Sequence, residues 1–138
     1  MPGQNETIHG LMVFIFKGEP KQNRMVKRKP KPIFQNKVAL ITGASSGIGR
    51  AAALAMAERG ACVALGARSF SALESLANQI RAAGGDVLAA PTDVSQPAEV
   101  ERLVKETLTR WGQIDILVAN AGQYIRCPFA RLTAAEIE

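Results

Sequence analysis

Four short apolar runs occur after residue 37, separated by longer segments in which apolar residues recur every three or four positions. The runs cover residues 38–41, 62–65, 87–90 and 116–119. Short runs without polar interruptions are typical of strands buried on both faces of a parallel sheet. The longer segments have the periodicity of helices that pack on such a sheet. The pattern therefore predicts strands and helices in alternation.

Capping residues predict where the helices begin and end. The first helix follows a glycine-rich turn and ends before Gly60, a residue type common just after helices. Ser71 and Glu74 form a capping box that predicts the start of the second helix, and Gly84 closes it. For the third helix we predict Ser95 as the N-cap, followed by Pro97 in the first turn and Gly112 after the end.

Strands that alternate with helices across short loops predict a parallel sheet built by right-handed crossovers. We therefore predict an α/β fold with a doubly wound parallel sheet, incomplete at about four strands. Thr133 and Glu136 form a further capping box, yet the sequence ends at Glu138, about one helical turn later. Because a single turn is not stable alone, we expect a domain truncated at its C-terminal end.

The basic charge of the chain is concentrated before the first strand. Residues 1–37 carry eight Lys/Arg and two Glu, a net charge of +6, whereas the following nine basic and ten acidic residues give −1. Prolines and like charges predict a basic, disordered leader over 1–35, followed by one folded domain over 36–138. Met25 is an alternative start. The other interpretation of the leader is a nucleic-acid or anionic-lipid contact, but interleaved aromatic residues are missing, so we expect no nucleic-acid partner.

Composition argues against several kinds of site. Cys62 and Cys127 are the only cysteines, and no CxxC or Cys/His cluster occurs, so we expect no metal site. Free cysteines fit a reducing compartment, and we predict a cytoplasmic protein. The apolar run 11–16 is far shorter than the roughly 18 residues of a spanning helix, and its basic residues follow it, unlike those of a signal peptide. We expect no membrane contact.

Three glycines, Gly43, Gly47 and Gly49, lie between the first strand and the first helix. The first would let the chain turn off the strand, the second would let the backbone approach a pyrophosphate, and the third would let the helix pack closely on the sheet. Free N–H groups and the positive end of the helix dipole would face the phosphates. The spacing differs from GxGxxG, and tight turns also use glycine, so the other strand ends are needed to support a dinucleotide site.

Residues at the other strand ends strengthen the dinucleotide hypothesis. After the second strand, where an acidic residue would accept the ribose hydroxyls of NAD, the sequence has Arg68 and no acid. A guanidinium suits the 2′-phosphate of NADP, although a solvated surface arginine is the alternative. Asp93 and Val94 follow the third strand and could contact adenine, or Asp93 could simply form a turn before a helix cap. The corner Asn120, Ala121 and Gly122 follows the fourth strand, where the cofactor ribose would pass.

These motifs resemble those of the short-chain dehydrogenase/reductase family. Residues 42–49, TGASSGIG, resemble its TGxxxGxG cofactor motif; Asp93-Val94 resembles its adenine-contacting pair; and residues 119–122, ANAG, resemble its NNAG motif with Ala119 in the first position. The resemblance covers about residues 35–138 and implies a Rossmann-like fold that binds NAD(P), with NADP(H) preferred over NAD(H).

The resemblance also implies roles for single residues. Ile48 would offer a backbone N–H to the pyrophosphate, and Ser45 would assist Arg68 at the 2′-phosphate. Asn120 would support the fourth strand and contact the ribose. Together with their neighbours in the three motifs, the implied cofactor-binding residues are Gly43, Ser45, Ser46, Gly47, Ile48, Gly49, Arg68, Asp93, Val94, Asn120, Ala121 and Gly122.

Family members pass a hydride between NAD(P)(H) and a carbonyl or alcohol, using a Tyr-x-x-x-Lys pair. The only tyrosine is Tyr124, Pro128 stands where the pair needs a lysine, and no lysine follows Lys105. We therefore assign no catalytic residue and expect the chain to be the cofactor-binding half of a short-chain oxidoreductase, inactive alone, whose full-length parent is a homo-oligomer. The alternative is a non-catalytic NADP(H)-binding module, in which the strand at 116–118 would leave a bare apolar edge.

Overall fold

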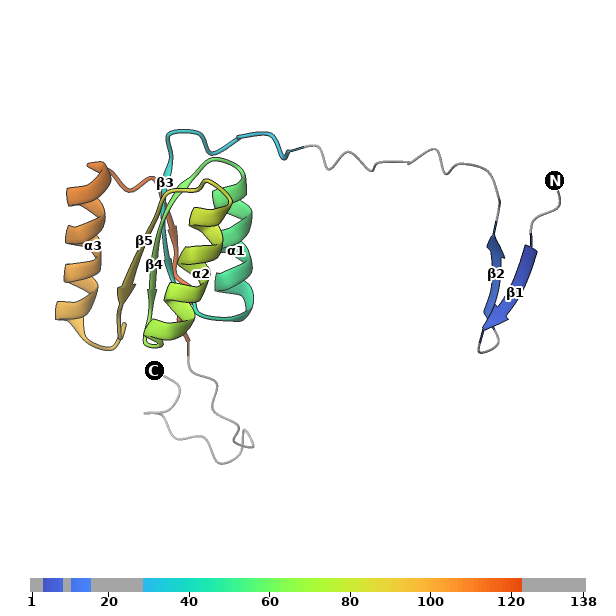
Figure 1. Cartoon of the computed structure of the whole chain (residues 1–138). Helices are drawn as coiled ribbons and strands as arrows, with labels where there is room; N and C mark the ends of the chain where they lie inside the picture. The colour runs from blue at the N-terminus through green and yellow to red at the C-terminus, as the bar shows by residue number, and fades with distance from the viewer. Residues whose placement is uncertain (1–3, 9–10, 16–28, 123–138) are drawn as a thin grey trace, which may run out of the picture.

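The computed structural model describes residues 4–8, 11–15 and 29–122. Four parallel strands alternate with three helices over the last of these ranges (Figure 1). In chain order these are β3 (Val38–Thr42), α1 (Gly47–Glu58), β4 (Cys62–Ala67), α2 (Phe70–Ala82), β5 (Val87–Pro91), α3 (Pro97–Trp111) and β6 (Ile116–Val118). The predicted alternation is confirmed, and each strand begins at the predicted residue.

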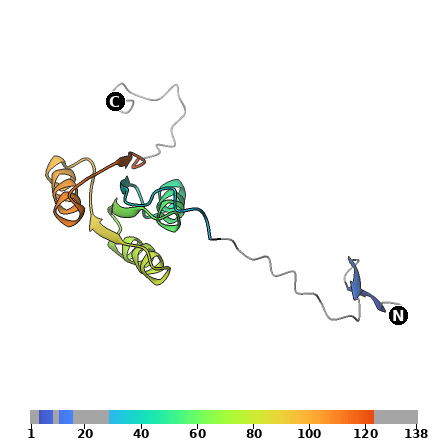
Figure 2. The ribbon, with the colours of Figure 1, turned by 90° about the horizontal axis from the view of Figure 1, so that it is seen from above.

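The sheet has the order β5-β4-β3-β6, so the first strand of the domain lies in its interior. Figure 2 shows α1 and α2 on one face of the sheet and α3 on the other. The chain winds outward from β3 through β4 to β5, then returns over the opposite face to pair β6 with β3. The predicted α/β class with a doubly wound parallel sheet is therefore confirmed.

Each face of the sheet has its own apolar core. Side chains of α1 and α2 pack on one face, where Ile41, Leu65 and Leu73 are fully buried. Beneath α3 the sheet presents small residues, and the core there is made by Leu40, Ala64, Ala90 and Leu103. A Cβ atom on Gly66 would come within 2.7 Å of Leu103 Cδ2. The small residues thus allow α3 to pack closely on the sheet.

Two predicted helix caps are wrong. The N-cap of α2 is Ser69, and Ser71 lies inside the helix. The N-cap of α3 is Gln96, because the Ser95 hydroxyl instead donates to Asp93 Oδ1 at 2.7 Å. In both cases a neighbouring residue within two positions competes for the cap, and the apolar pattern does not discriminate between them.

The predicted helix ends agree with the structure. Pro97 is the first residue of α3, and Gly112 follows its end with φ of 74°, its N–H donating to the Leu108 carbonyl at 2.7 Å. Gly60 and Gly84 also have positive φ just after α1 and α2. Left-handed backbone at these positions favours glycine.

Two further strands lie in the part of the chain for which we predicted a disordered leader. β1 (Gln4–Ile8) pairs antiparallel with β2 (Leu11–Ile15), placing Gln4 opposite Ile15. These strands were not predicted: the apolar run at residues 11–16 covers β2 but was interpreted only as too short for a membrane span. A two-stranded hairpin needs only backbone pairing between neighbouring segments.

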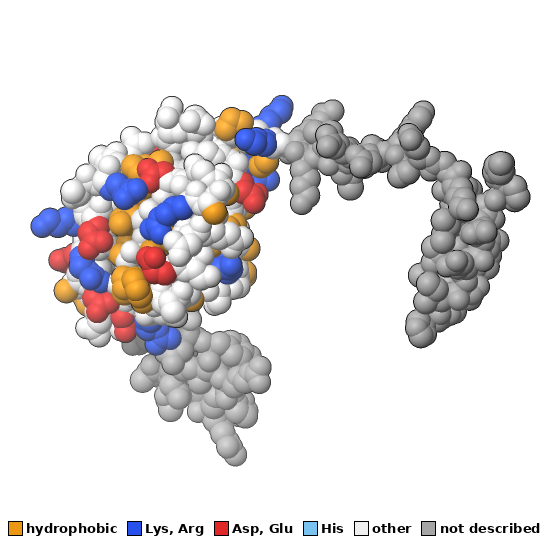
Figure 3. Space-filling model, viewed as in Figure 1, with side chains coloured by type: hydrophobic (Ala, Val, Ile, Leu, Met, Phe, Trp, Pro, Cys, Tyr) orange, Lys and Arg blue, Asp and Glu red, His pale blue; other side chains and the backbone are white. Residues whose placement is uncertain are grey.

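Acidic and basic side chains are interspersed over the face of residues 29–122 in Figure 3, as expected from the near-neutral charge of this part of the sequence. Within the described ranges no helix combines the length and apolar character needed to cross a membrane.

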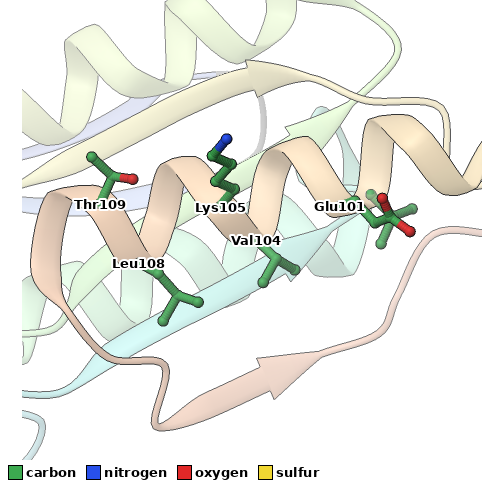
Figure 4. A pocket seen from close by; sticks show the side chains of 6 residues that line it. Glu101, Val104, Lys105, Leu108 and Thr109 are labelled. Carbon is green, nitrogen blue, oxygen red and sulfur yellow. The ribbon is translucent and has the colours of Figure 1, made fainter.

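Part of the α3 face of the sheet is not covered by α3. Leu117 of β6 is 66% exposed, and Leu108 of α3 is 44% exposed. In Figure 4, Val104 and Leu108 extend to one side of α3 while Lys105 and Thr109 extend to the other, so apolar side chains line one wall of a surface hollow. Among the described residues β6 pairs only with β3.

A cluster at the amino-terminal edge of the sheet ties β5 to the end of α3. Asp86, directly before β5, accepts hydrogen bonds from Arg110 at 2.5 Å and from the Trp111 indole N–H at 2.8 Å. Burial acts to raise the pKa of Asp86. The hydrogen bonds from Trp111 and Arg110, with the charge of Arg110, outweigh it and hold that pKa below its ordinary value of 3.8.

The pKa of Asp86 makes part of the stability dependent on pH. Asp86→Asn is expected to lower the free energy of unfolding at neutral pH by about 1 kcal/mol, because it removes the charge that attracts Arg110. The loss is small because both side chains of the Asp86–Arg110 ion pair are half exposed and the solvent screens them. A carboxylate with a lowered folded pKa stabilises the fold above its unfolded pKa, and this contribution is lost as pH falls through the folded pKa. The difference from wild type in urea unfolding should therefore shrink as pH falls below about 4.

The matched control is Glu101→Gln, an exposed carboxylate on α3 with no ion pair among the described residues. It should leave unfolding unchanged across the same pH range. An Asp86→Asn difference that stayed constant into acid would show that the hydrogen-bond geometry, and not the charge, ties α3 to β5.

Candidate cofactor site

The predicted site residues lie at the carboxyl edge of the sheet. β3 pairs with β4 on one side and with β6 on the other; α1 leads from β3 to β4 on one face of the sheet, whereas α3 leads to β6 on the opposite face. Open parallel sheets bind ligands at such a switch point, outside the carboxyl ends of the strands. The glycine loop after β3 and the corner at residues 120–122 flank this position.

The amino end of α1 is open towards the solvent. Its N-cap, Ser46, has extended backbone and makes no side-chain capping hydrogen bond. The first turn is closed by the Arg50 N–H, which donates to the Ser46 carbonyl at 3.3 Å. The N–H groups of residues 47–49 precede that bond, so they are oriented to receive an anion at the positive end of the helix.

Gly47 lies where a ligand would approach these amides. Its φ is +54°, and a Cβ atom at this position would meet no other segment of the described chain within 4 Å. Glycine is favoured here by the left-handed backbone, and the space beside it is free. This geometry fits the pyrophosphate of a dinucleotide.

Gly43 and Gly49 have a different role, since both are enclosed by protein. A Cβ on Gly49 would overlap the Gly43 carbonyl and come within 2.6 Å of Asn120 Nδ2. A Cβ on Gly43 would come within 2.9 Å of Ala121 Cα. The Asn120 amide also donates to the Gly43 carbonyl at 3.3 Å. These residues bring α1, β3 and the corner after β6 into close contact.

Thr42, which we did not assign to the site from sequence, joins the same elements. Its hydroxyl oxygen accepts the backbone N–H groups of Asn120 and Ala121, each at 3.2 Å, and donates to the Val118 carbonyl at 3.5 Å. The sequence feature that could have pointed to Thr42 is a hydroxyl residue at the end of the apolar run 38–41. Thr42 therefore positions the corner after β6 relative to the glycine loop.

Arg68 and Asp93 lie close together at the ends of β4 and β5. Arg68 is exposed, and no ion pair within the described ranges involves it. Hydrogen bonds from the Ser95 hydroxyl and backbone N–H hold the pKa of Asp93 below its ordinary value, and the positive charge of Arg68 lowers it further. Asp93 thus forms the turn that we named as the alternative to an adenine contact, and the adenine contact stays a prediction.

The remaining predicted residues lie at the same edge with fewer contacts. Ile48 is 78% exposed and Val94 is 44% exposed. A Cβ on Gly122 would meet nothing within 4 Å. Ser45 is half-buried, and no hydrogen bond in the described part of the chain links it to Arg68. No group of three or more His, Cys, Asp or Glu side chains there could hold a metal ion. Tyr124, Cys127 and the capping box at Thr133 lie outside the described residues.

Comparison with known proteins connects this geometry to a family. The family model described as short chain dehydrogenase matches residues 37–138. Glycine betaine reductase ATRR of Emericella nidulans is 49% identical over 106 residues, which are 77% of this chain and 8% of that protein. The short-chain dehydrogenase/reductase homolog YusS of Bacillus subtilis is 41% identical over 101 residues, covering 72% of this chain and 93% of that protein.

Solved structures of dehydrogenases also resemble this chain. The alcohol dehydrogenase from the archaeon Thermococcus sibiricus, complexed with 5-hydroxy-NADP, superposes with a TM-score of 0.67 at 44% identity, covering 72% of this chain and 43% of that one. Among six of the curated relatives, the chain spans 8 to 42% of the relative's length.

Proposed function

The chain belongs to the short-chain dehydrogenase/reductase family, and we propose that it is the cofactor-binding half of an oxidoreductase that transfers a hydride between NADP(H) and a carbonyl or alcohol substrate. The observation that carries the proposal is the open amino end of α1 at Gly47, with unoccupied space beside uncapped amides. These residues fit a pyrophosphate by shape and by charge.

The residues have distinct roles in holding such a cofactor. The amides of residues 47–49 bind the pyrophosphate, Asn120 lies beside the ribose, and Arg68 meets the 2′-phosphate. Bound NADPH supplies the hydride. Thr42, Gly43 and Gly49 also fix the distance between the glycine loop and the corner after β6.

A preference for NADP(H) follows from the charge after β4. The segment 66–69 contains no acidic residue that could accept the ribose hydroxyls of NAD. Arg68 is exposed and engaged in no ion pair of the described chain, so its guanidinium is available to a phosphate. The complex of the Thermococcus sibiricus enzyme with an NADP analogue supports binding of this cofactor class within the family.

Arg68→Glu is expected to reverse the cofactor preference. The wild-type chain should bind NADPH more tightly than NADH, and the variant should lose about 10- to 100-fold in affinity for NADPH, because a charge-assisted pair becomes a like-charge contact. Affinity for NADH should change little. Fluorescence titration of both chains with both cofactors measures this.

The control for net charge is Lys105→Glu on α3, which carries the same change in charge away from the carboxyl edge and should leave both affinities unchanged. Equal binding of NADPH by wild type and Arg68→Glu would remove the 2′-phosphate assignment. Failure of the wild-type chain to bind either cofactor would overturn the proposed function itself.

A further inference from the structure

Exposed apolar side chains gather at the carboxyl edge of the sheet. Ile48, Phe70 and Val94 are 78%, 56% and 44% exposed, respectively. They follow the ends of β3, β4 and β5, which are neighbouring parallel strands. Three large apolar side chains therefore lie along one edge, beside the open amides of α1. Exposed apolar groups that gather at a polar site are typical of a binding surface.

Phe70 has no role in the interpretation given above. It is the first residue of α2, directly after the N-cap Ser69 and two residues after Arg68. More than half of its side chain faces solvent, although apolar residues at helix starts commonly pack into the core. Its contribution to stability through burial is accordingly small.

We propose that Phe70 forms one face of the adenine subsite, so that the base of the bound dinucleotide packs against its ring. This inference rests on the proposed function. The adenine and the 2′-phosphate are attached to the same ribose, so a phosphate held by Arg68 places the base at the ends of β4 and β5. β4 and β5 pair with Ala67 opposite Pro91, so these two strand ends are adjacent.

In this arrangement the adenine base contacts two exposed apolar side chains, Val94 and Phe70. Val94 follows Asp93 directly and is half exposed, whereas Phe70 provides an aromatic face from the neighbouring strand end. Bases stack on aromatic side chains through their π-faces. The polar edge of the base stays accessible to solvent.

Titration of the full chain with three probes tests this assignment. The probes are NADPH, 2′,5′-ADP and inorganic pyrophosphate. Phe70→Ala should weaken NADPH and 2′,5′-ADP about tenfold, while pyrophosphate, which has no base, binds as it does to wild type. Phe70→Tyr keeps the ring and should restore the affinity. Ile33→Ala removes an apolar side chain of similar exposure, 64%, before β3, and should change nothing.

Thermal unfolding of each variant excludes a loss of fold as the cause, and rescue by Phe70→Tyr separates stacking from a structural role. If Phe70→Ala binds 2′,5′-ADP as tightly as wild type, the base lies elsewhere and only this inference fails. If the wild-type chain binds none of the three probes, the proposed function fails with it.

Discussion

Gly47→Val is expected to abolish cofactor binding while most of the fold survives. No other segment of the described chain comes within 4 Å of a Cβ on Gly47, so a side chain there would occupy the volume assigned to the pyrophosphate. It would also separate the phosphates from the amides of residues 47–49, which removes the favourable interaction with the helix end. We expect affinity for NADPH to fall by more than about 100-fold, the equivalent of roughly 3 kcal/mol.

The valine also strains the backbone, because φ at Gly47 is +54° and β-branched residues avoid this region. Gly112→Val reproduces the strain without the site, since Gly112 has φ of +74° and equally free space at the end of α3. Both variants should lose about 1–2 kcal/mol of unfolding free energy, measured in urea. Only Gly47→Val should lose NADPH binding in titration; retained binding would mean that the glycine serves the turn alone.

Gly49→Ala is expected to affect the fold and not primarily the cofactor site: a single methyl group should cause a large loss of stability. The new Cβ would overlap the Gly43 carbonyl, which is backbone, and would press on the Asn120 amide. Alanine has the higher helix propensity by about 1 kcal/mol, but overpacking of an enclosed site costs about 1–3 kcal/mol or more. We expect a net loss of about 2 kcal/mol, measured as a lower midpoint of urea unfolding.

The control for Gly49→Ala is Gly122→Ala, at the same edge of the sheet. Its Cβ would meet no other part of the described chain within 4 Å, and its φ is not positive, so stability should be unchanged. Wild-type stability of Gly49→Ala would show that the loop after β3 and the corner after β6 can separate without cost. The contact among Gly43, Gly49 and Asn120 would then not be the feature that joins α1 to the sheet.

The contrast between Gly47 and Gly49 shows what sequence could and could not predict. The turn at Gly43 and the close packing at Gly49 could be predicted, because they depend on local geometry between a strand and a helix; the pyrophosphate contact at Gly47 stays a prediction. The partner of Gly49 could not, since Asn120 lies far along the chain and the contact exists only after β6 pairs with β3. Thr42 was not assigned for the same reason: its two N–H donors belong to the corner after β6.

Strand positions were predicted well because parallel strands buried on both faces are continuous apolar runs. Strand order did not follow from those runs, since the same alternation is compatible with several sheets. Helix caps were the least accurate part of the prediction. Ser69 and Ser71 are the same residue type, so the sequence does not show which of them caps α2. The Ser95 hydroxyl could cap α3 or bond to Asp93, and the structure has the bond to Asp93. Phe70 was overlooked because a phenylalanine in an amphipathic segment is usually a core residue, and only its exposure of 56% distinguishes it.

The interior position of β3 has a consequence for how the chain assembles. β3 is the earliest strand of the domain in the sequence, and β6, which pairs with it, comes only after β4, β5 and α3. Until β6 arrives, one long side of β3 presents free backbone donors and acceptors in an apolar context. Such an edge can pair with strands from other chains. Refolding at high protein concentration should therefore be most prone to aggregation just before β6 pairs with β3.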